Sequence, residues 1–220
     1  MLAPIDEYGS EAMAQAYLSA AFLEQAPGDP APRAAWLAGR VLLSRLLNQG
    51  LLPPLPVAPS GKPLPVSPAM PAFSISHSCG FIAVLLGPDG QSVGCDIERL
   101  RPRKGLMDIA RHYFSPPEVA HLEQCSARMA GIAKGGVNEQ TTAFWKSWTL
   151  REAILKQQER SVWDMADIRL WPQPPYSDVH AVQCWHKDGI SIACCLTEPA
   201  EVVIESLHHR ATSGIDPRIV

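Results

Sequence analysis

Two charged stretches that lie far apart in the sequence constrain this chain most. In the later stretch, Glu152 and Lys156 are four residues apart, so on a helix they lie on one face, one turn from each other. In the earlier stretch, Asp96 and Glu98 are two residues apart, so on a strand both carboxylates point to the same side of the sheet. Three carboxylates that leave room for water and phosphate oxygens suit Mg²⁺, and a lysine one turn away suits the phosphate itself. We therefore expect the fold to bring these two stretches together around one cation.

Composition excludes several classes of protein. The net charge of −3 and the pI near 6.2 argue against nucleic-acid binding, which usually needs a strongly basic domain. A chain of 220 residues, 46% hydrophobic and 19% charged, is typical of a globular protein with one domain or two fused halves. No apolar run reaches the length of a membrane span and the N-terminus does not resemble a signal peptide, so we expect a cytoplasmic protein. We also expect a monomer. The six cysteines form no C-x-x-C pair, which predicts reduced, mostly buried thiols.

Apolar periodicity and turn residues predict alternating helices and strands. Helices are expected at residues 11–25, 31–48, 107–112, 116–124 and 139–158. Strands are expected at residues 73–76, 81–86, 92–98, 167–171, 179–186, 190–196 and 201–207. The first three strands should form an antiparallel meander. The proline-rich residues 51–71 predict an extended loop, and the glycines of residues 125–138 predict a mobile one.

A faint internal repeat predicts how these elements are arranged. The long helix of each half carries three residues in the same pattern, i, i+4 and i+7. They are Trp36, Arg40 and Leu43 in the first half and Trp148, Glu152 and Leu155 in the second. Matches this short often arise by chance. Together with the elements, they predict an α+β fold of two similar lobes related by a pseudo-twofold axis. The lobes would span residues 1–98 and 99–210, followed by a tail at 211–220.

Five short motifs follow one another in the middle of the chain. They are Gly61–Pro63, Ser74–Ser78, Val93–Glu98, Phe114–Ser115 with Glu118, and Trp148–Lys156. Any one of them is weak, but in this order they resemble the 4′-phosphopantetheinyl transferase superfamily. The resemblance is to its longer, two-lobed Sfp-type class, which includes the AcpT-like holo-acyl-carrier-protein synthases.

The resemblance implies a reaction and roles for the acidic residues. Coenzyme A would bind between the lobes, and its 4′-phosphopantetheine arm would pass to a serine of an apo acyl carrier protein, with release of adenosine 3′,5′-bisphosphate. Asp96, Glu98 and Glu152 would hold Mg²⁺ against the pyrophosphate, and Glu152 could also take the serine proton. Lys156 would balance charge on the leaving phosphate. Glu118 matches an acidic position that the longer class associates with the metal site and catalysis.

The resemblance also implies contacts with coenzyme A. Lys62 and His77 would contact the 3′-phosphate. Further contacts with coenzyme A would come from Ser76, Lys156, Arg151, Arg40 and Arg33. The family usually has lysine where this chain has Arg151. Arginine keeps the charge and adds a planar fork that suits phosphate. We therefore expect the activity to be retained, with an altered geometry of the contacts that this side chain makes.

Alternatives remain for each of these features. An isolated D-x-E pair is more often a solvated strand edge, and a Glu–Lys pair on a helix is often an ordinary salt bridge of about 0.3 to 0.5 kcal/mol. The cluster Arg99, Arg101, Arg103 and Lys104 is either a solubilising surface or a docking rim for an acidic carrier protein of fatty-acid or related synthesis. A non-catalytic relative that only binds carrier protein or coenzyme A, and a metal-dependent phosphohydrolase, are the rival functions.

Overall fold

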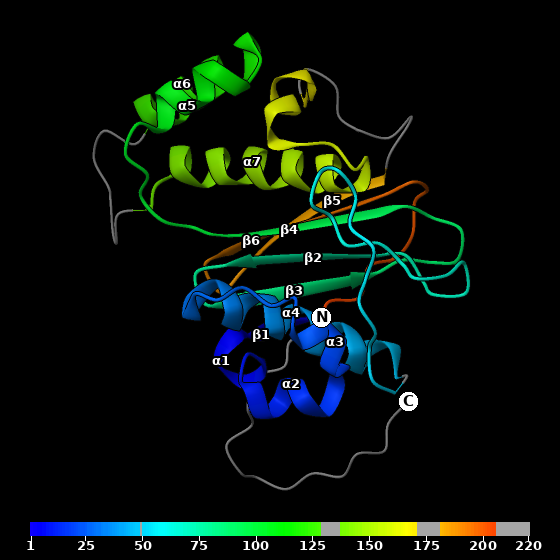
Figure 1. Ribbon diagram of the computed structural model, residues 1–220. Coiled ribbons are helices and arrows are strands. Elements are labelled where there is room, and N and C mark those ends of the chain that lie inside the picture. Colours follow the sequence, from blue (N-terminus) through cyan, green and yellow to red (C-terminus); the bar gives the residue numbers. More distant parts are fainter. Residues whose placement is uncertain (49, 129–136, 171–180, 206–220) are drawn as a thin grey trace, which may run out of the picture.

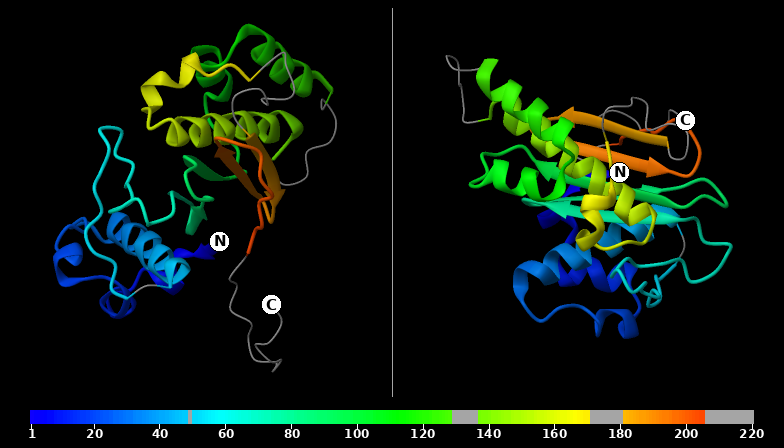
Figure 2. Two further views of the ribbon diagram at one scale, coloured as in Figure 1. Left: turned by 90° about the vertical axis from the view of Figure 1, so that its right-hand side faces the viewer. Right: turned by 90° about the horizontal axis from the view of Figure 1, so that it is seen from above.

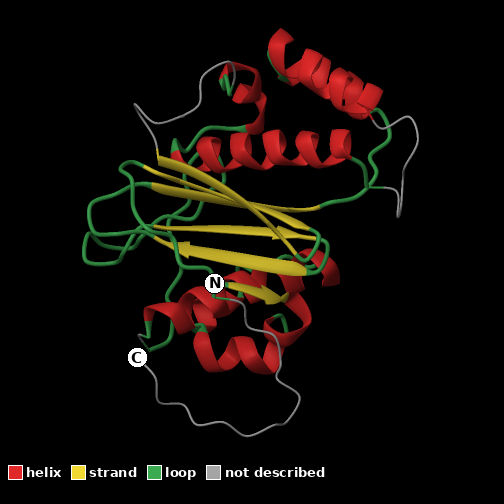
Figure 3. Cartoon of the chain, turned by 180° about the vertical axis from the view of Figure 1, so that it is seen from behind, coloured by secondary structure: helices red, strands yellow, loops and turns green. Residues whose placement is uncertain are grey.

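The computed structural model describes residues 1–48, 50–128, 137–170 and 181–205, and it contains two three-stranded antiparallel sheets (Figure 1). The first sheet has β1 (Leu2–Pro4), β3 (Phe81–Leu86) and β2 (Phe73–Ser78) in that spatial order. The second has β4 (Val93–Arg99), β6 (Ile190–Leu196) and β5 (Ala181–Lys187). Figures 1 and 3 show helices above and below the strands, so the strands form the middle of the molecule.

Both sheets belong to lobes of the same connectivity. In the first lobe, β1 is followed by α1 (Ile5–Tyr8), α2 (Glu11–Tyr17), α3 (Ala20–Leu23) and the long α4 (Pro30–Leu47), then by the β2–β3 hairpin. In the second, β4 is followed by α5 (Leu106–Tyr113), α6 (Pro116–Arg128), the long α7 (Glu139–Gln157) and the 3₁₀ helix η1 (Val162–Asp167), then by the β5–β6 hairpin. The order of strands within each sheet is also the same. The prediction of two similar α+β lobes is confirmed.

Each long helix covers its own sheet and buries an apolar face there. Leu37, Val41 and Leu42 of α4 are almost fully buried against the first sheet, and Leu150, Ala153 and Leu155 of α7 against the second. The views in Figure 2 show the two helix layers on opposite sides of the strands. This placement leaves the junction of the two sheets, between β2 and β4, directly beside α7.

The structure corrects the prediction of a three-stranded meander. β2 and β3 form the expected hairpin, but β4 pairs with β6 and not with β3. β4 instead lies beside β2, where serine hydroxyls of β2 accept hydrogen bonds from backbone N–H groups of β4. The second sheet therefore begins at Val93, before the predicted lobe boundary at residue 98, and that division of the chain stays a prediction.

Several other predicted elements are changed by capping and packing. The helix expected at residues 11–25 is divided, because Leu18 is extended and the hydroxyl of Ser19 caps α3 by accepting the Phe22 N–H. No strand is present over residues 167–170 or 201–205, and α6 continues to Arg128, into the expected loop. The rest of that loop and the tail at 211–220 lie outside the described residues.

Two predictions from composition are consistent with the structure. All six cysteines are free, and four of them, Cys95, Cys125, Cys194 and Cys195, are buried. Among the described residues, no helix combines the length and apolar character needed to cross a membrane.

Candidate active site

Close contact between α7 and β4 brings the two charged stretches together. Gly94 makes this contact possible, because a Cβ at that position would lie well inside van der Waals distance of the Ala153 carbonyl oxygen and the Gln157 amide nitrogen. The helix backbone therefore rests directly on the strand. Glu152 and Lys156 of α7 consequently lie over the part of β4 that carries Asp96 and Glu98.

Asp96 is the buried centre of the site. Its Oδ1 accepts hydrogen bonds from Lys156 Nζ at 2.7 Å and from Ser76 Oγ at 2.7 Å. Lys156 Nζ also donates to Ser76 Oγ at 3.0 Å. The other oxygen, Oδ2, is buried and has no hydrogen-bond partner within the described residues. A buried carboxylate oxygen without a partner is costly, so this atom is a strong candidate to bind a cation.

The neighbouring carboxylates repel one another. Burial and the negative charges of Asp96 and Glu98 together raise the pKa of Glu152 to about 7, against the opposing effect of the nearby Lys156. Burial also raises the pKa of Glu98, although a hydrogen bond from Ser78 Oγ to Glu98 Oε2 at 2.6 Å opposes this effect. The site thus holds more negative charge than its one lysine offsets.

This donor set fits a divalent cation. As the side chains stand, the described residues contain no group of three His, Cys, Asp or Glu side chains in metal-binding geometry. The unpartnered Asp96 Oδ2 and the raised pKa of Glu152 are nevertheless what three carboxylates show before a cation joins them. Oxygen ligands few enough to leave space for water and phosphate suit Mg²⁺.

A cavity of about 170 Å³ is lined by cationic side chains, among them Lys156, which also bonds Asp96. Its lining residues include the Gly61–Pro63 turn, Ser74 and Ile75 of β2, Lys156 near the end of α7, and Arg160 just beyond that helix. Lys62 Nζ donates to the carbonyl of Val93 at 3.0 Å, and burial lowers the pKa of Lys62. The Gly61–Pro63 motif and the end of α7 therefore line the same cavity, whose cationic side chains suit an anion.

An arginine and a histidine also lie on this side of the molecule. Burial lowers the pKa of Arg40 to about 10. Its guanidinium lies 4.3 Å from the Trp36 ring centroid, and its Nε has no partner among the described residues. His77, at the exposed end of β2, has a pKa lowered by burial and by the positive charges of Lys156 and Arg40. The structure thus places Arg40, His77 and Lys156 within electrostatic reach of one another.

The other predicted site residues lie in different surroundings. Arg33 pairs with Glu11 and donates to the carbonyls of Ala26 and Pro27 at 3.4 and 3.2 Å. Arg151 is fully buried and donates from one nitrogen to both oxygens of Glu118, at 2.7 and 2.6 Å. Glu118 also accepts hydrogen bonds from the backbone N–H and the hydroxyl of Ser115, just before α6. The roles of these residues with coenzyme A and in catalysis stay predictions.

The basic cluster lies against two tryptophans. The Arg101 and Arg103 guanidinium carbons lie 5.4 and 5.6 Å from the Trp145 ring centroid, and that of Arg103 also lies 5.9 Å from the Trp148 ring centroid. Trp145 Nε1 donates to the Arg101 carbonyl at 2.8 Å. The arginines are exposed and held over a packed aromatic base, which suits a preformed docking surface.

Sequence reasoning missed three residues of this region. Gly94 was recognisable as a glycine inside a strand, a position that often marks close approach by another backbone. Arg160 lies beyond the end of α7 at Gln157, so its position beside Lys156 depends on the turn at residues 158–159, which helical spacing does not predict. Ser78 belongs to the serine alternation of β2, but its contact with Glu98 depends on the register of β2 against β4.

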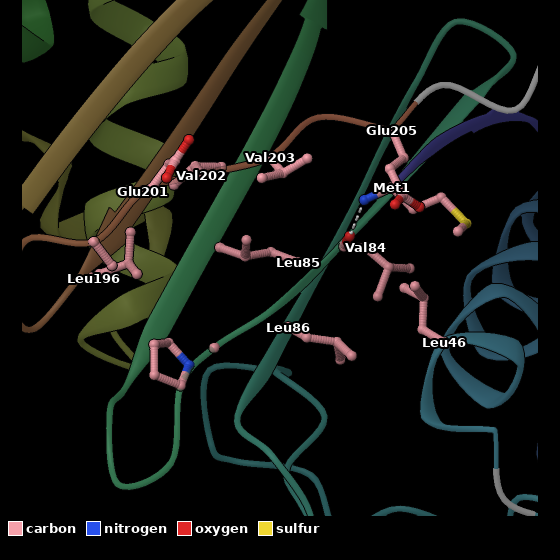
Figure 4. A pocket seen from close by; sticks show the side chains of 13 residues that line it. Met1, Leu46, Val84, Leu85, Leu86, Leu196, Glu201, Val202, Val203 and Glu205 are labelled. Atoms are coloured by element: carbon pink, nitrogen blue, oxygen red, sulfur yellow. Dashed lines mark hydrogen bonds between the residues drawn. The ribbon is translucent and has the colours of Figure 1, made fainter. Parts of the chain in front are cut away.

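A larger cavity, of about 400 Å³, contains none of the candidate residues. It is lined mainly by apolar side chains of β3 and of residues 200–205, close to the hydrogen bond from the Met1 amine to the Val84 carbonyl (Figure 4). The carboxylates of Glu201 and Glu205 at its rim do not suit an anionic ligand.

Comparisons with known proteins agree with this geometry. Residues 92–199 match the model of a family described as the 4′-phosphopantetheinyl transferase superfamily. The chain is 38% identical to the 4′-phosphopantetheinyl transferase AcpT of Salmonella typhimurium, over 81% of this chain and 84% of that protein. It is 35% identical to AcpT of Escherichia coli strain K12, over 84% and 85% of the two chains. To the 4′-phosphopantetheinyl transferase Sfp of Bacillus subtilis it is 29% identical, over 58% and 55%.

Proposed function

Because the chain belongs to the 4′-phosphopantetheinyl transferase superfamily, and is therefore a transferase, we propose that it modifies an apo acyl carrier protein. The reaction moves the 4′-phosphopantetheine group of coenzyme A to a serine of the carrier, depends on Mg²⁺ and releases adenosine 3′,5′-bisphosphate. The observation that carries this proposal is the unpartnered Asp96 Oδ2 beside Glu152 and a cation-lined cavity.

The acidic residues hold the metal and handle the proton. Asp96, Glu98 and Glu152 would hold Mg²⁺, which when bound neutralises charge on the pyrophosphate oxygens. The serine oxygen bonds to the phosphorus that carries the pantetheine arm, while the bond from that phosphorus to the bridging oxygen breaks. Glu152 receives the serine proton, for which a pKa near neutrality is well suited.

The cationic residues bind the nucleotide and the leaving group. Lys156 stabilises the negative charge that develops on the departing phosphate, since positioned charges are the main source of catalysis in phosphoryl transfer. Lys62 and His77 recognise the 3′-phosphate, and Arg40 and Ser76 add contacts to coenzyme A. The burial of Arg40 and Lys62 supports these roles, because a half-buried cation gains strongly from an anionic partner.

The partner in this proposal is an acidic carrier protein. The exposed arginines over Trp145 give it a complementary surface, although the whole chain has a net charge of −3. We place the enzyme in the cytoplasm as a monomer that serves fatty-acid or related biosynthesis.

Mass spectrometry of a purified apo carrier protein tests the proposal. With the enzyme, coenzyme A and Mg²⁺ present, the carrier should gain one phosphopantetheine arm, and chelation of the metal should stop the gain. Asp96→Asn and Glu152→Gln should abolish transfer while circular dichroism shows a retained fold. Asp89→Asn, an exposed acid in the β3–β4 turn, is the matched control and should stay active.

Two other outcomes would reject the proposal. Binding of coenzyme A without any mass gain on carrier proteins indicates a non-catalytic relative. Release of nucleotide with no carrier present indicates a phosphohydrolase.

A further inference from the structure

Serines at alternate positions of β2 join the two sheets. The hydroxyls of Ser74, Ser76 and Ser78 accept hydrogen bonds from the backbone N–H groups of Cys95, Ile97 and Arg99 at 2.9, 3.2 and 3.4 Å. The constant difference of 21 residues between partners means that β2 and β4 run parallel here. Side-chain hydroxyls thus take the place of backbone carbonyls between the lobes.

Two of these hydroxyls also contact the acidic residues of the site. Ser76 Oγ donates to Asp96 Oδ1 at 2.7 Å, and Ser78 Oγ donates to Glu98 Oε2 at 2.6 Å. A hydroxyl has one proton and two lone pairs. Once Oγ accepts a backbone N–H of β4, its proton is free to point at the carboxylate that projects from the same strand. One oxygen of each acid is therefore fixed by β2.

We propose that Ser76 and Ser78 are positioning residues, which orient Asp96 and Glu98 toward the divalent cation of the proposed function, on which this inference rests. The serine bonds hold Oδ1 and Oε2, and the cation takes the remaining oxygens, including the unpartnered Asp96 Oδ2. Hydrogen bonds to metal-binding carboxylates fix the orientation of the ligands, and their loss weakens metal affinity about 10- to 100-fold.

The three serines of β2 include a control residue. Ser74 bridges to β4 in the same way as Ser78, but it makes its hydrogen bonds with Cys95 and not with a carboxylate. Ser74→Ala therefore removes one bridge between the sheets, whereas Ser78→Ala removes a bridge and the support of Glu98. Ser76 is less suitable for the test because it also bonds Lys156.

Direct metal titration separates the two effects. Mn²⁺ is titrated into the full-length protein without coenzyme A, and free Mn²⁺ is followed by electron paramagnetic resonance, with melting temperatures measured in parallel. Ser78→Ala should raise the Mn²⁺ Kd about tenfold or more, and Ser74→Ala should change it less than about twofold. Ser78→Thr, which keeps the hydroxyl and suits a strand, should restore affinity.

The outcomes distinguish this inference from the proposed function. Equal Kd values for Ser78→Ala and Ser74→Ala, or no rescue by Ser78→Thr, would overturn the positioning role while wild-type metal binding and transfer stand. Absence of Mn²⁺ binding by the wild type would reject the metal site itself, and the inference with it.

Discussion

At the scale of single residues, Glu152 connects stability to pH. Burial, Asp96 and Glu98 raise its folded-state pKa to about 7, above its ordinary value of 4.5. A carboxyl with a raised pKa contributes stability that is fully present below about pH 4.5 and is lost as the pH rises through 7. Without metal, we expect the wild type to lose up to about 3 kcal/mol of unfolding free energy from this group between pH 4.5 and 8.

Urea unfolding in the presence of a chelator measures this loss. Glu152→Gln cannot ionise at this position, so its unfolding free energy should fall less over the same pH range and exceed that of the wild type at pH 8. Added Mg²⁺ should stabilise the wild type at pH 8 and have a weaker effect on the variant. An identical pH dependence of the two proteins would show that Glu152 does not titrate as described.

The pair of Arg151 and Glu118 has a structural role. Arg151 is fully buried, bonds both Glu118 oxygens and lies 4.1 Å from the Phe114 ring centroid. We expect Arg151→Met to lower the unfolding free energy by about 3 to 5 kcal/mol, because it leaves Glu118 buried without its partner. Arg151→Lys should lower the unfolding free energy less, because the positive charge remains. Some loss is still expected, because lysine lacks the planar fork and the ring contact.

An exposed ion pair supplies the control for this prediction. Arg111 and Glu123 are joined at 3.1 Å with more than half of each side chain accessible, so Arg111→Met should change stability by less than about 1 kcal/mol. If Arg151→Met changed the unfolding free energy as little as Arg111→Met, the buried pair would not stabilise the packing of α6 on α7. Adding Glu118→Leu to Arg151→Met should recover part of the loss.

At the scale of elements, the contact of α7 with β4 builds the site. Gly94→Ala places a methyl group against the backbone of α7 and should push the helix away from the strand. We expect a loss of about 1 to 3 kcal/mol in unfolding free energy and a further loss of transfer activity, because Glu152 and Lys156 move with the helix. Gly28→Ala, where no atom lies within 4 Å of the added carbon, is the control for both measurements. A fully active Gly94→Ala enzyme would contradict this role for the contact.

The loop that carries Lys62 provides a separate test of substrate binding. If Lys62 recognises the 3′-phosphate, Lys62→Ala should raise the KM for coenzyme A about tenfold or more with a smaller change in kcat. Dephospho-coenzyme A lacks that phosphate, so its KM should change little. Lys146→Ala, an exposed lysine of α7, is the control. Equal effects on both substrates would place Lys62 elsewhere on the ligand.

At the scale of the whole molecule, charge distribution decides how the partner approaches. If the partner is the proposed acidic carrier, its attraction should be concentrated at the arginines over Trp145, because the chain as a whole has a net charge of −3. We expect Arg103→Glu to lower kcat/KM for the carrier about tenfold or more and to remove most of the salt dependence of the reaction. Arg111→Glu reverses a charge on α5 outside this cluster and should have a smaller effect. A salt-independent wild type would reject electrostatic docking.

Local patterns were enough to predict most elements and to identify charged residues that the fold brings together. The α4 and α7 helices and the β5–β6 hairpin follow from apolar periodicity and turn residues, which act between near neighbours in the chain. Asp96, Glu98, Glu152 and Lys156 were identifiable because spacing on a strand or helix determines which side chains share a face. The splitting of the helix at Ser19 was missed because a hydroxyl cap competed with a continuous apolar pattern.

The sequence by itself determined two α+β lobes and an acidic, lysine-bearing site, because these depend on local periodicity and side-chain chemistry. Only the tertiary structure decided that β4 pairs with β6, that Arg151 is buried against Glu118, and that β2 serines hold Asp96 and Glu98. These features depend on contacts between residues distant in the chain. Such contacts form where close packing and the satisfaction of buried polar groups leave one arrangement, and no local pattern encodes that choice.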